Sequence, residues 1–163
     1  MEPIDGFFNH ALNLAASSKG SGCEQVDLRR AVSAAYYAVF HLLSMTAAEC
    51  WGVPADRARF ARLFDHGKMK NVSTGLPGKI KVRLGVAPSP QDVAVGDALK
   101  IISEELVTLQ TGRHVADYDN SKVWSYTEVE SVILRAIDVY TQWESLAKHP
   151  LATAYLLDML SGK

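Results

Sequence analysis

The sequence contains few of the residues from which covalent or metal-based frameworks are built. Only two of its 163 residues are cysteines, Cys23 and Cys50. Two thiols are too few for a disulfide framework, and their separation is not that of a metal site. No group of histidine, cysteine and carboxylate residues has zinc-ligand spacing either, so we expect neither a metal nor a cofactor. A hydrophobic core must therefore stabilise the chain, and a reducing, cytoplasmic environment is the expectation.

Clear export and membrane signals are also lacking. The first ten residues, "MEPIDGFFNH", begin acidic and have no basic region before an apolar run, which argues against a signal peptide. Residues 31–48 carry no formal charge, but they include four polar residues and fall short of the roughly 20 strongly apolar residues of a membrane span. We expect a buried central helix there and no membrane partner.

No stretch alternates apolar and polar residues as a β-strand would, whereas apolar residues recur at helical spacing along most of the chain. Ser89 with Pro90 and Asp92 is a typical helix start, and Thr127 with Glu130 has the spacing of a capping box. Together these patterns predict helices over residues 3–17, 25–50, 55–65, from 89 onward, from 127 to about 148, and 150–160. The sequence thus predicts a single all-α domain over residues 1–163, an antiparallel bundle of four to five main helices.

One stretch interrupts the helical pattern and is rich in basic residues. Residues 66–90 hold four glycines and three prolines, which predict a long surface loop over residues 66–89, and loops of this length are usually functional or disordered. Between residues 57 and 91 the chain has eight basic residues and one acidic residue, a net charge of +7, and the remainder carries −8. Such asymmetry favours a basic surface that binds an anion, although a solvated loop neutralised by acidic neighbours is an equal alternative. The candidate binding residues are Arg59, Lys68, Lys70, Lys79, Lys81 and Arg83.

A second candidate site lies in "TGRHVADYDNS", residues 111–121. If the helix that begins near residue 89 continues past Gly112, its apolar stripe extends to Arg113 and Asp117, which are four residues apart and would share a face. Charges on a core-facing side must be paired or line a cleft, and Tyr118 could add its hydroxyl. Alternatively, Gly112 ends the helix and the segment is a polar turn.

Two histidines are candidates for a general base. His66 borders the basic segment and follows Arg59, and an arginine near a histidine can stabilise a phosphate transition state. His114 lies beside Arg113 in sequence but about 100° round a helix from it, so it is more simply a surface residue. The candidate catalytic residues are therefore His66 and Arg113.

Two segments of the sequence resemble segments of a known protein family, and a third segment lies between them. "LRRAVSAAYYAVFHLLS", residues 28–44, resembles the second-helix signature of small bacterial and archaeal HEPN-domain proteins, and "RHVADYD", residues 113–119, resembles the R-x-x-x-D-Y segment of one HEPN subgroup. "FDHGKM", residues 64–69, is similar to the histidine-bearing stretch between them. The resemblance covers about residues 25–145.

The resemblance implies a helical bundle, often a homodimer, in a superfamily associated with RNA cleavage or nucleotide binding. Many members belong to toxin–antitoxin or defence systems, and some pair with a nucleotidyltransferase. Ribonuclease members carry R-x(4–6)-H, but the corresponding positions after Arg113 hold Tyr118, Asp119 and Asn120. We therefore expect a module that binds RNA or a nucleotide. The alternatives are a metal-independent ribonuclease and a non-catalytic partner of a nucleotidyltransferase.

Overall fold

The computed structural model describes residues 2–17 and 25–163, so Cys23 lies outside the described part. These residues form seven α-helices and one short 3-10 helix, and no strand occurs among them. The all-α prediction is confirmed. In chain order the elements are α1 (Glu2–Ser17), α2 (Gln25–Trp51), η1 (Pro54–Asp56), α3 (Arg57–Ala61), α4 (His66–Leu84), α5 (Pro90–Tyr118), α6 (Tyr126–Leu146) and α7 (Pro150–Ser161).

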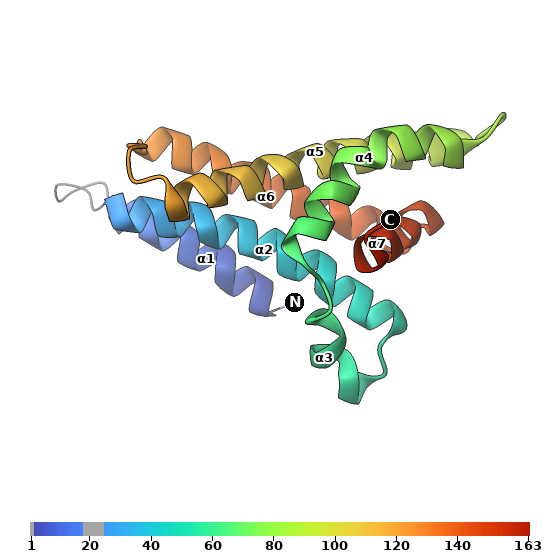
Figure 1. Ribbon diagram of the computed structural model, residues 1–163, viewed down its shortest axis with the longest axis horizontal. Coiled ribbons are helices and arrows are strands. Elements are labelled where there is room, and N and C mark those ends of the chain that lie inside the picture. The colour runs from blue at the N-terminus through green and yellow to red at the C-terminus, as the bar shows by residue number, and fades with distance from the viewer. Residues whose placement is uncertain (1, 18–24) are drawn as a thin grey trace.

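Helix α2 is the centre of the bundle. It packs against α1, α3, α5, α6 and α7, and residues around its whole circumference are buried, as its nearly uniform apolar character predicts (Figure 1). By length and composition it is the one helix in the described residues that could cross a membrane, but 78% of its most apolar window is buried inside the protein. That burial is the behaviour of a core helix.

The prediction of a basic loop over residues 66–89 is wrong for most of that range, because residues 66–84 form helix α4. Met69, Val72, Leu76 and Ile80 recur at helical spacing, and all four are buried against the core. Glycine and proline cost helix stability, but tertiary burial of this apolar stripe outweighs that cost. Only residues 85–89 connect α4 to α5.

Local signals set the two ends of α4. Its first residue follows Asp65, whose Oδ1 accepts a hydrogen bond from the backbone N–H of Lys68 at 2.9 Å. The helix ends at Leu84, and the next residue, Gly85, has a φ of 66°, a conformation that glycine adopts without strain. Helix α5 packs closely against α4 at Gly96, where an added Cβ would lie 3.0 Å from Cγ2 of Ile80.

The start of α5 is confirmed and the start of α6 is corrected. Ser89 and Asp92 form a complete capping box at the beginning of α5. At α6 the capping box is formed by Ser125 and Glu128, two residues before the predicted Thr127 and Glu130. Both pairs have a three-residue spacing with a hydroxyl first, and the earlier pair places Val129 in the core.

Helix α3 and helix α7 complete the fold at one end of the bundle. α3 is shorter than predicted and is preceded by η1, and it projects from the bundle near the end of α2 (Figure 1). α7 packs on α4, α5 and α2, and it begins at the proline that the sequence indicated.

Candidate functional site

Helix α5 continues through Gly112 to Tyr118 and brings two charged side chains onto the face that packs against α2. Nε of Arg113 lies 2.6 Å from Oδ2 of Asp117, so the predicted ion pair at i, i+4 is confirmed. Its N–H does not point at the carboxylate, which makes the contact one of charge more than a linear hydrogen bond. With side chains 20% and 29% exposed, the pair lies at the edge of the core, where it can contact a ligand.

Two side chains of α2 hold this ion pair in place. Arg113 donates from Nη2 to the hydroxyl of Tyr37 at 3.1 Å, and Ser33 donates from Oγ to Oδ1 of Asp117 at 2.6 Å. The guanidinium also lies over the rings of Tyr37 and Tyr118, at 5.6 and 5.8 Å from their centroids. Both charges are therefore oriented by neighbours before any ligand binds.

His66, the first residue of α4, joins the same group although it is 47 residues from Arg113 in the chain. Its Nδ1 shares a 2.6 Å hydrogen bond with the hydroxyl of the buried Tyr36, and its ring packs 4.2 Å from that of Phe40. Its edge also meets Tyr37, with the centroids 5.8 Å apart, so Tyr37 contacts both His66 and Arg113. The backbone carbonyl of His66 accepts from Gln110 on α5 at 2.9 Å.

The electrostatics of this group keep the imidazole neutral and the guanidinium charged. Burial lowers the pKa of His66, the positive charge of Arg113 lowers it further, and Asp65 only partly opposes them. Burial also acts to lower the pKa of Arg113, but Asp117 and Tyr37 outweigh it, and the net pKa is raised. At pH 7 the cluster therefore presents a neutral histidine, able to accept or donate a proton, next to a fixed positive charge.

The candidate lysines lie at different distances along the chain from this cluster. Lys70 lies on the α5-facing side of α4, with Nζ 3.4 Å from Oγ1 of Thr111. The stem of Lys68 instead lies beside Gly162, at the end of α7. Lys79 and Arg83 lie about two and a half and three and a half helical turns beyond Lys70 on α4, where both face α7. Lys70 follows His66 by four residues on α4, and its contact Thr111 precedes Arg113 by two residues on α5, so it is the candidate lysine with a contact beside the cluster.

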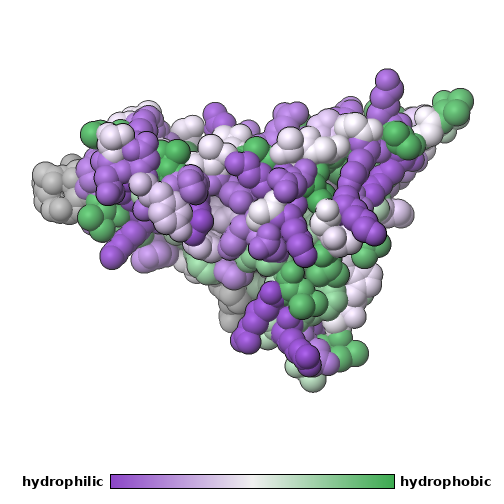
Figure 2. All heavy atoms as spheres, viewed as in Figure 1, coloured by the Kyte–Doolittle hydropathy of each residue, from purple (hydrophilic) through white to green (hydrophobic). Residues whose placement is uncertain are grey.

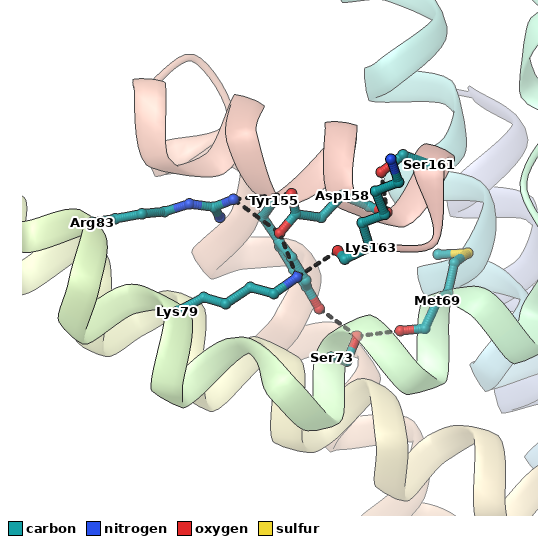
Figure 3. Close-up of polar contacts among 8 residues, drawn as sticks. All are labelled: Met69, Ser73, Lys79, Arg83, Tyr155, Asp158, Ser161 and Lys163. Carbon is teal, nitrogen blue, oxygen red and sulfur yellow. Dashed lines mark hydrogen bonds and ion pairs between the residues drawn. The ribbon is translucent and has the colours of Figure 1, made fainter.

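Lys79 and Arg83 attach α7 to α4 (Figure 3). Nζ of Lys79 lies 3.0 Å from Oδ2 of Asp158, and Nη2 of Arg83 lies 2.9 Å from both carboxylate oxygens. Lys79 also donates to the backbone carbonyl of Lys163. One turn away, the hydroxyl of the fully buried Tyr155 bonds Oγ of Ser73 at 2.6 Å, and Ser73 bonds the carbonyl of Met69. Lys79 and Arg83, both candidate binding residues, thus share the carboxylate of Asp158.

The remaining candidates lie on the surface outside the cluster. Arg59 is exposed on α3, and Lys81 is exposed on α4. Tyr118 is 65% exposed and stacks near His114, with the ring centroids 4.9 Å apart, so His114 does not face His66. Of the sequence-derived site residues, the structure brings together His66, Arg113 and Asp117, with Tyr118 at the edge and Lys70 one turn after His66 on α4.

Several residues of the site were not among the candidates named from the sequence. Tyr36, Tyr37 and Phe40 have the pattern of core aromatics, and only the tertiary packing shows that their polar atoms and ring faces hold His66 and Arg113. His41 stacks between Phe7 and Tyr37, at 5.0 and 6.2 Å, and burial lowers its pKa. Beyond His41 a groove of about 640 Å³ opens between α2 and α3.

No family model, no curated protein and no solved structure matches the chain. Among the residues that the structure describes, no group of three or more histidine, cysteine or carboxylate side chains could hold a metal ion.

Proposed function

We propose that this chain binds RNA or a nucleotide, with the phosphate contacted by Arg113 and Lys70 beside His66. The observation that carries the proposal is the meeting of His66 and Arg113 on one tyrosine, Tyr37, although three different helices supply the three residues. Arginine is well suited to phosphate because its planar guanidinium offers several donors. This role also agrees with the resemblance of residues 113–119 to a HEPN segment.

The geometry favours a compact contact over a long basic track. Lys79 and Arg83 are occupied by Asp158, so the cations free to contact a phosphate chain are fewer than the sequence charge implies. Each phosphate that a cation contacts releases counterions, and the slope of binding against salt counts these contacts. We therefore expect a shallow slope of about two, from Arg113 and Lys70, instead of the six or more that the whole basic segment would give.

The test is a fluorescence-anisotropy titration of labelled RNA oligonucleotides, and of a labelled nucleotide, at two ionic strengths. In the double variant Arg113→Gln, Lys70→Gln, affinity should fall by roughly tenfold or more, because both charge-assisted contacts are lost. The matched control is Lys81→Gln, an exposed cation on α4 outside the cluster, which should change affinity less than about twofold. Absence of binding at low salt, or equal losses in both variants, would remove the proposal.

One observation favours a second candidate, a metal-independent ribonuclease. His66 is held at Nδ1 by Tyr36 and is kept neutral by burial and by Arg113, which is the state that a general base needs at pH 7. Arg113 would then stabilise the charge that develops on the phosphate. Because no metal is required, cleavage of RNA should persist in EDTA.

A gel assay with RNA in EDTA separates the two candidates. Wild type and His114→Ala should cleave, and His66→Ala should not, if the enzyme proposal holds. Intact RNA in all three samples would leave the binding proposal alone. The broader expectations of a homodimer, a nucleotidyltransferase partner within a toxin–antitoxin or defence system, and a cytoplasmic location remain proposals that rest on the HEPN resemblance.

A further inference from the structure

The groove between α2 and α3 has the dimensions of a small-molecule site. Its volume of about 640 Å³ falls within the range of known ligand pockets. Side chains from the second half of α2 form one wall, and those of η1, α3 and the residues after α3 form the other. A ring contact from Trp51 to Phe60, with centroids 6.4 Å apart, joins the two walls, and Phe60 also lies 6.5 Å from Phe64 within the second wall.

The walls of this groove are mostly apolar. They are formed by Phe40, Met45, Ala48, Ala61 and Phe64, with few polar atoms among them. Figure 2 shows hydrophobic side chains gathered over the projecting α3 region, with long hydrophilic side chains beside them. A ligand with several hydrogen-bonding groups on its body, such as a nucleobase, would lose its contacts with water there without replacement. The walls therefore favour an apolar body.

The rim of the groove is charged, and its two arginines have no carboxylate partner. Arg57 and Arg62 line the groove and are exposed, and neither makes an ion pair within residues 2–17 and 25–163. Glu49 lines the same groove, so the charge of these three side chains is +1. His41 adds no charge at pH 7, because burial lowers its pKa. The net field at the rim attracts an anion.

We propose that this groove binds a small amphipathic anion, a molecule with an apolar body and one carboxylate or phosphate head. The body packs among Phe40, Met45 and Phe64, and the head lies between Arg57 and Arg62. Burial of the body supplies most of the affinity, and the two guanidiniums select the charge of the head. This site adjoins the Arg113 cluster at Phe40 but uses different charged residues, and the proposal does not depend on RNA binding.

Isothermal titration calorimetry with four probes tests both parts of the ligand. Decanoate and decyl phosphate carry the apolar body and an anionic head, decanol carries the body alone, and AMP carries a phosphate on a polar body. Both amphipathic anions should bind, and decanol and AMP should each bind roughly tenfold more weakly or not at all. A preference between the two anions identifies the head group.

Three variants and one control locate the site. Arg57→Gln with Arg62→Gln should weaken decanoate binding by roughly tenfold, whereas Arg59→Gln, on the same helix but outside the groove, should change it less than about twofold. Ala58→Phe, at an exposed position of the groove wall, should block binding by filling it. Glu49→Gln should strengthen binding, because it removes the one negative charge of the lining. Circular dichroism verifies that each variant is folded.

Three outcomes would overturn the inference. Neither anion gives a heat of binding at millimolar concentration, the Arg57/Arg62 and Arg59 variants lose decanoate affinity equally, or a folded Ala58→Phe protein binds decanoate as tightly as wild type does. Tighter binding of AMP than of decanoate, lost in the Arg57/Arg62 variant, would make the groove a nucleotide site instead. RNA binding retained in the Arg57/Arg62 variant would show that the two sites are independent.

Discussion

The two halves of the basic segment have opposite surroundings. On α3 and directly after it, Arg57, Arg59 and Arg62 are exposed, and none makes an ion pair among the described residues. On the second half of α4, Lys79 and Arg83 both bind Asp158. A charge count treats these residues alike, but only the cations without a carboxylate partner remain available to a negatively charged ligand.

The difference arises from what each helix packs against. Along α4 the chain packs on α7, whose C-terminal turn provides Asp158 and backbone carbonyls, and cations are stabilised near the C-terminal end of a helix. α3 packs mainly on α2 and η1, neither of which gives a carboxylate to its arginines, and these side chains are exposed. Position in the fold, more than net charge, therefore separates cations that stabilise the fold from cations that can bind.

The largest expected effect comes from Asp158→Asn. This change leaves two partly buried cations without their carboxylate and should lower the free energy of unfolding by about 1–3 kcal/mol. Urea denaturation followed by circular dichroism measures it. The control is Asp97→Asn, which removes an exposed carboxylate paired with Lys100 and should cost less than about 0.5 kcal/mol. Equal losses would mean that the Asp158 contacts do not hold α7 in place.

A smaller effect is expected from Tyr155→Phe. The phenol is fully buried and its hydroxyl bonds Ser73, which keeps its own bond to the carbonyl of Met69. Loss of this one bond should cost about 0.5–1.5 kcal/mol in the same urea experiment. A double-mutant cycle with Ser73→Ala isolates the pair, and a coupling energy near zero would show that packing alone joins α4 and α7 here.

Acid should weaken the fold through two partly buried histidines, His41 and His66. Burial lowers the pKa of His41, and burial with Arg113 lowers that of His66, so both stay neutral above pH 6.5 in the folded and unfolded states. Below pH 6.5 the unfolded chain binds protons more readily, and stability should fall as the pH drops toward the lowered values. In His41→Phe, which keeps the aromatic stack, the fall in melting temperature between pH 7.5 and pH 5 should be smaller. An unchanged fall would show that His41 does not contribute.

The smallest effect on stability is expected on α3. Replacing Arg57, Arg59 and Arg62 together by glutamine should change the free energy of unfolding by less than about 0.5 kcal/mol, because these side chains are exposed and lack carboxylate partners. Urea denaturation checks this as well. A loss above about 1 kcal/mol would show that the arginines stabilise α3 and would remove the contrast with α4.

The helical class could be predicted from the sequence, because most apolar positions recur at helical spacing. The stripe of Met69, Val72, Leu76 and Ile80 was also present in the sequence, but the glycines and Pro77 within it gave the opposite local signal. Local propensity is worth about 1 kcal/mol per glycine, and burial of four large side chains exceeds it. The loop prediction failed for that reason.

Within the candidate site, only the contact between residues close together in the sequence could be predicted. Arg113 and Asp117 are four residues apart on one helix, and their pairing followed from that spacing. The partners Ser33 and Tyr37 lie more than 70 residues away in the chain, and Asp158 lies as far from Lys79. Such contacts depend on how helices pack, and neither spacing nor composition encodes them in a form that can be read without the fold.

The most direct test of the account compares two double variants in one RNA titration at low salt. Lys70→Gln with Arg113→Gln should reduce affinity by roughly tenfold or more, whereas Lys79→Gln with Arg83→Gln should keep affinity within about twofold while lowering the melting temperature. Equal losses of affinity in the two variants would contradict the claim that the paired cations of α4 serve the fold and the cluster at Arg113 serves binding.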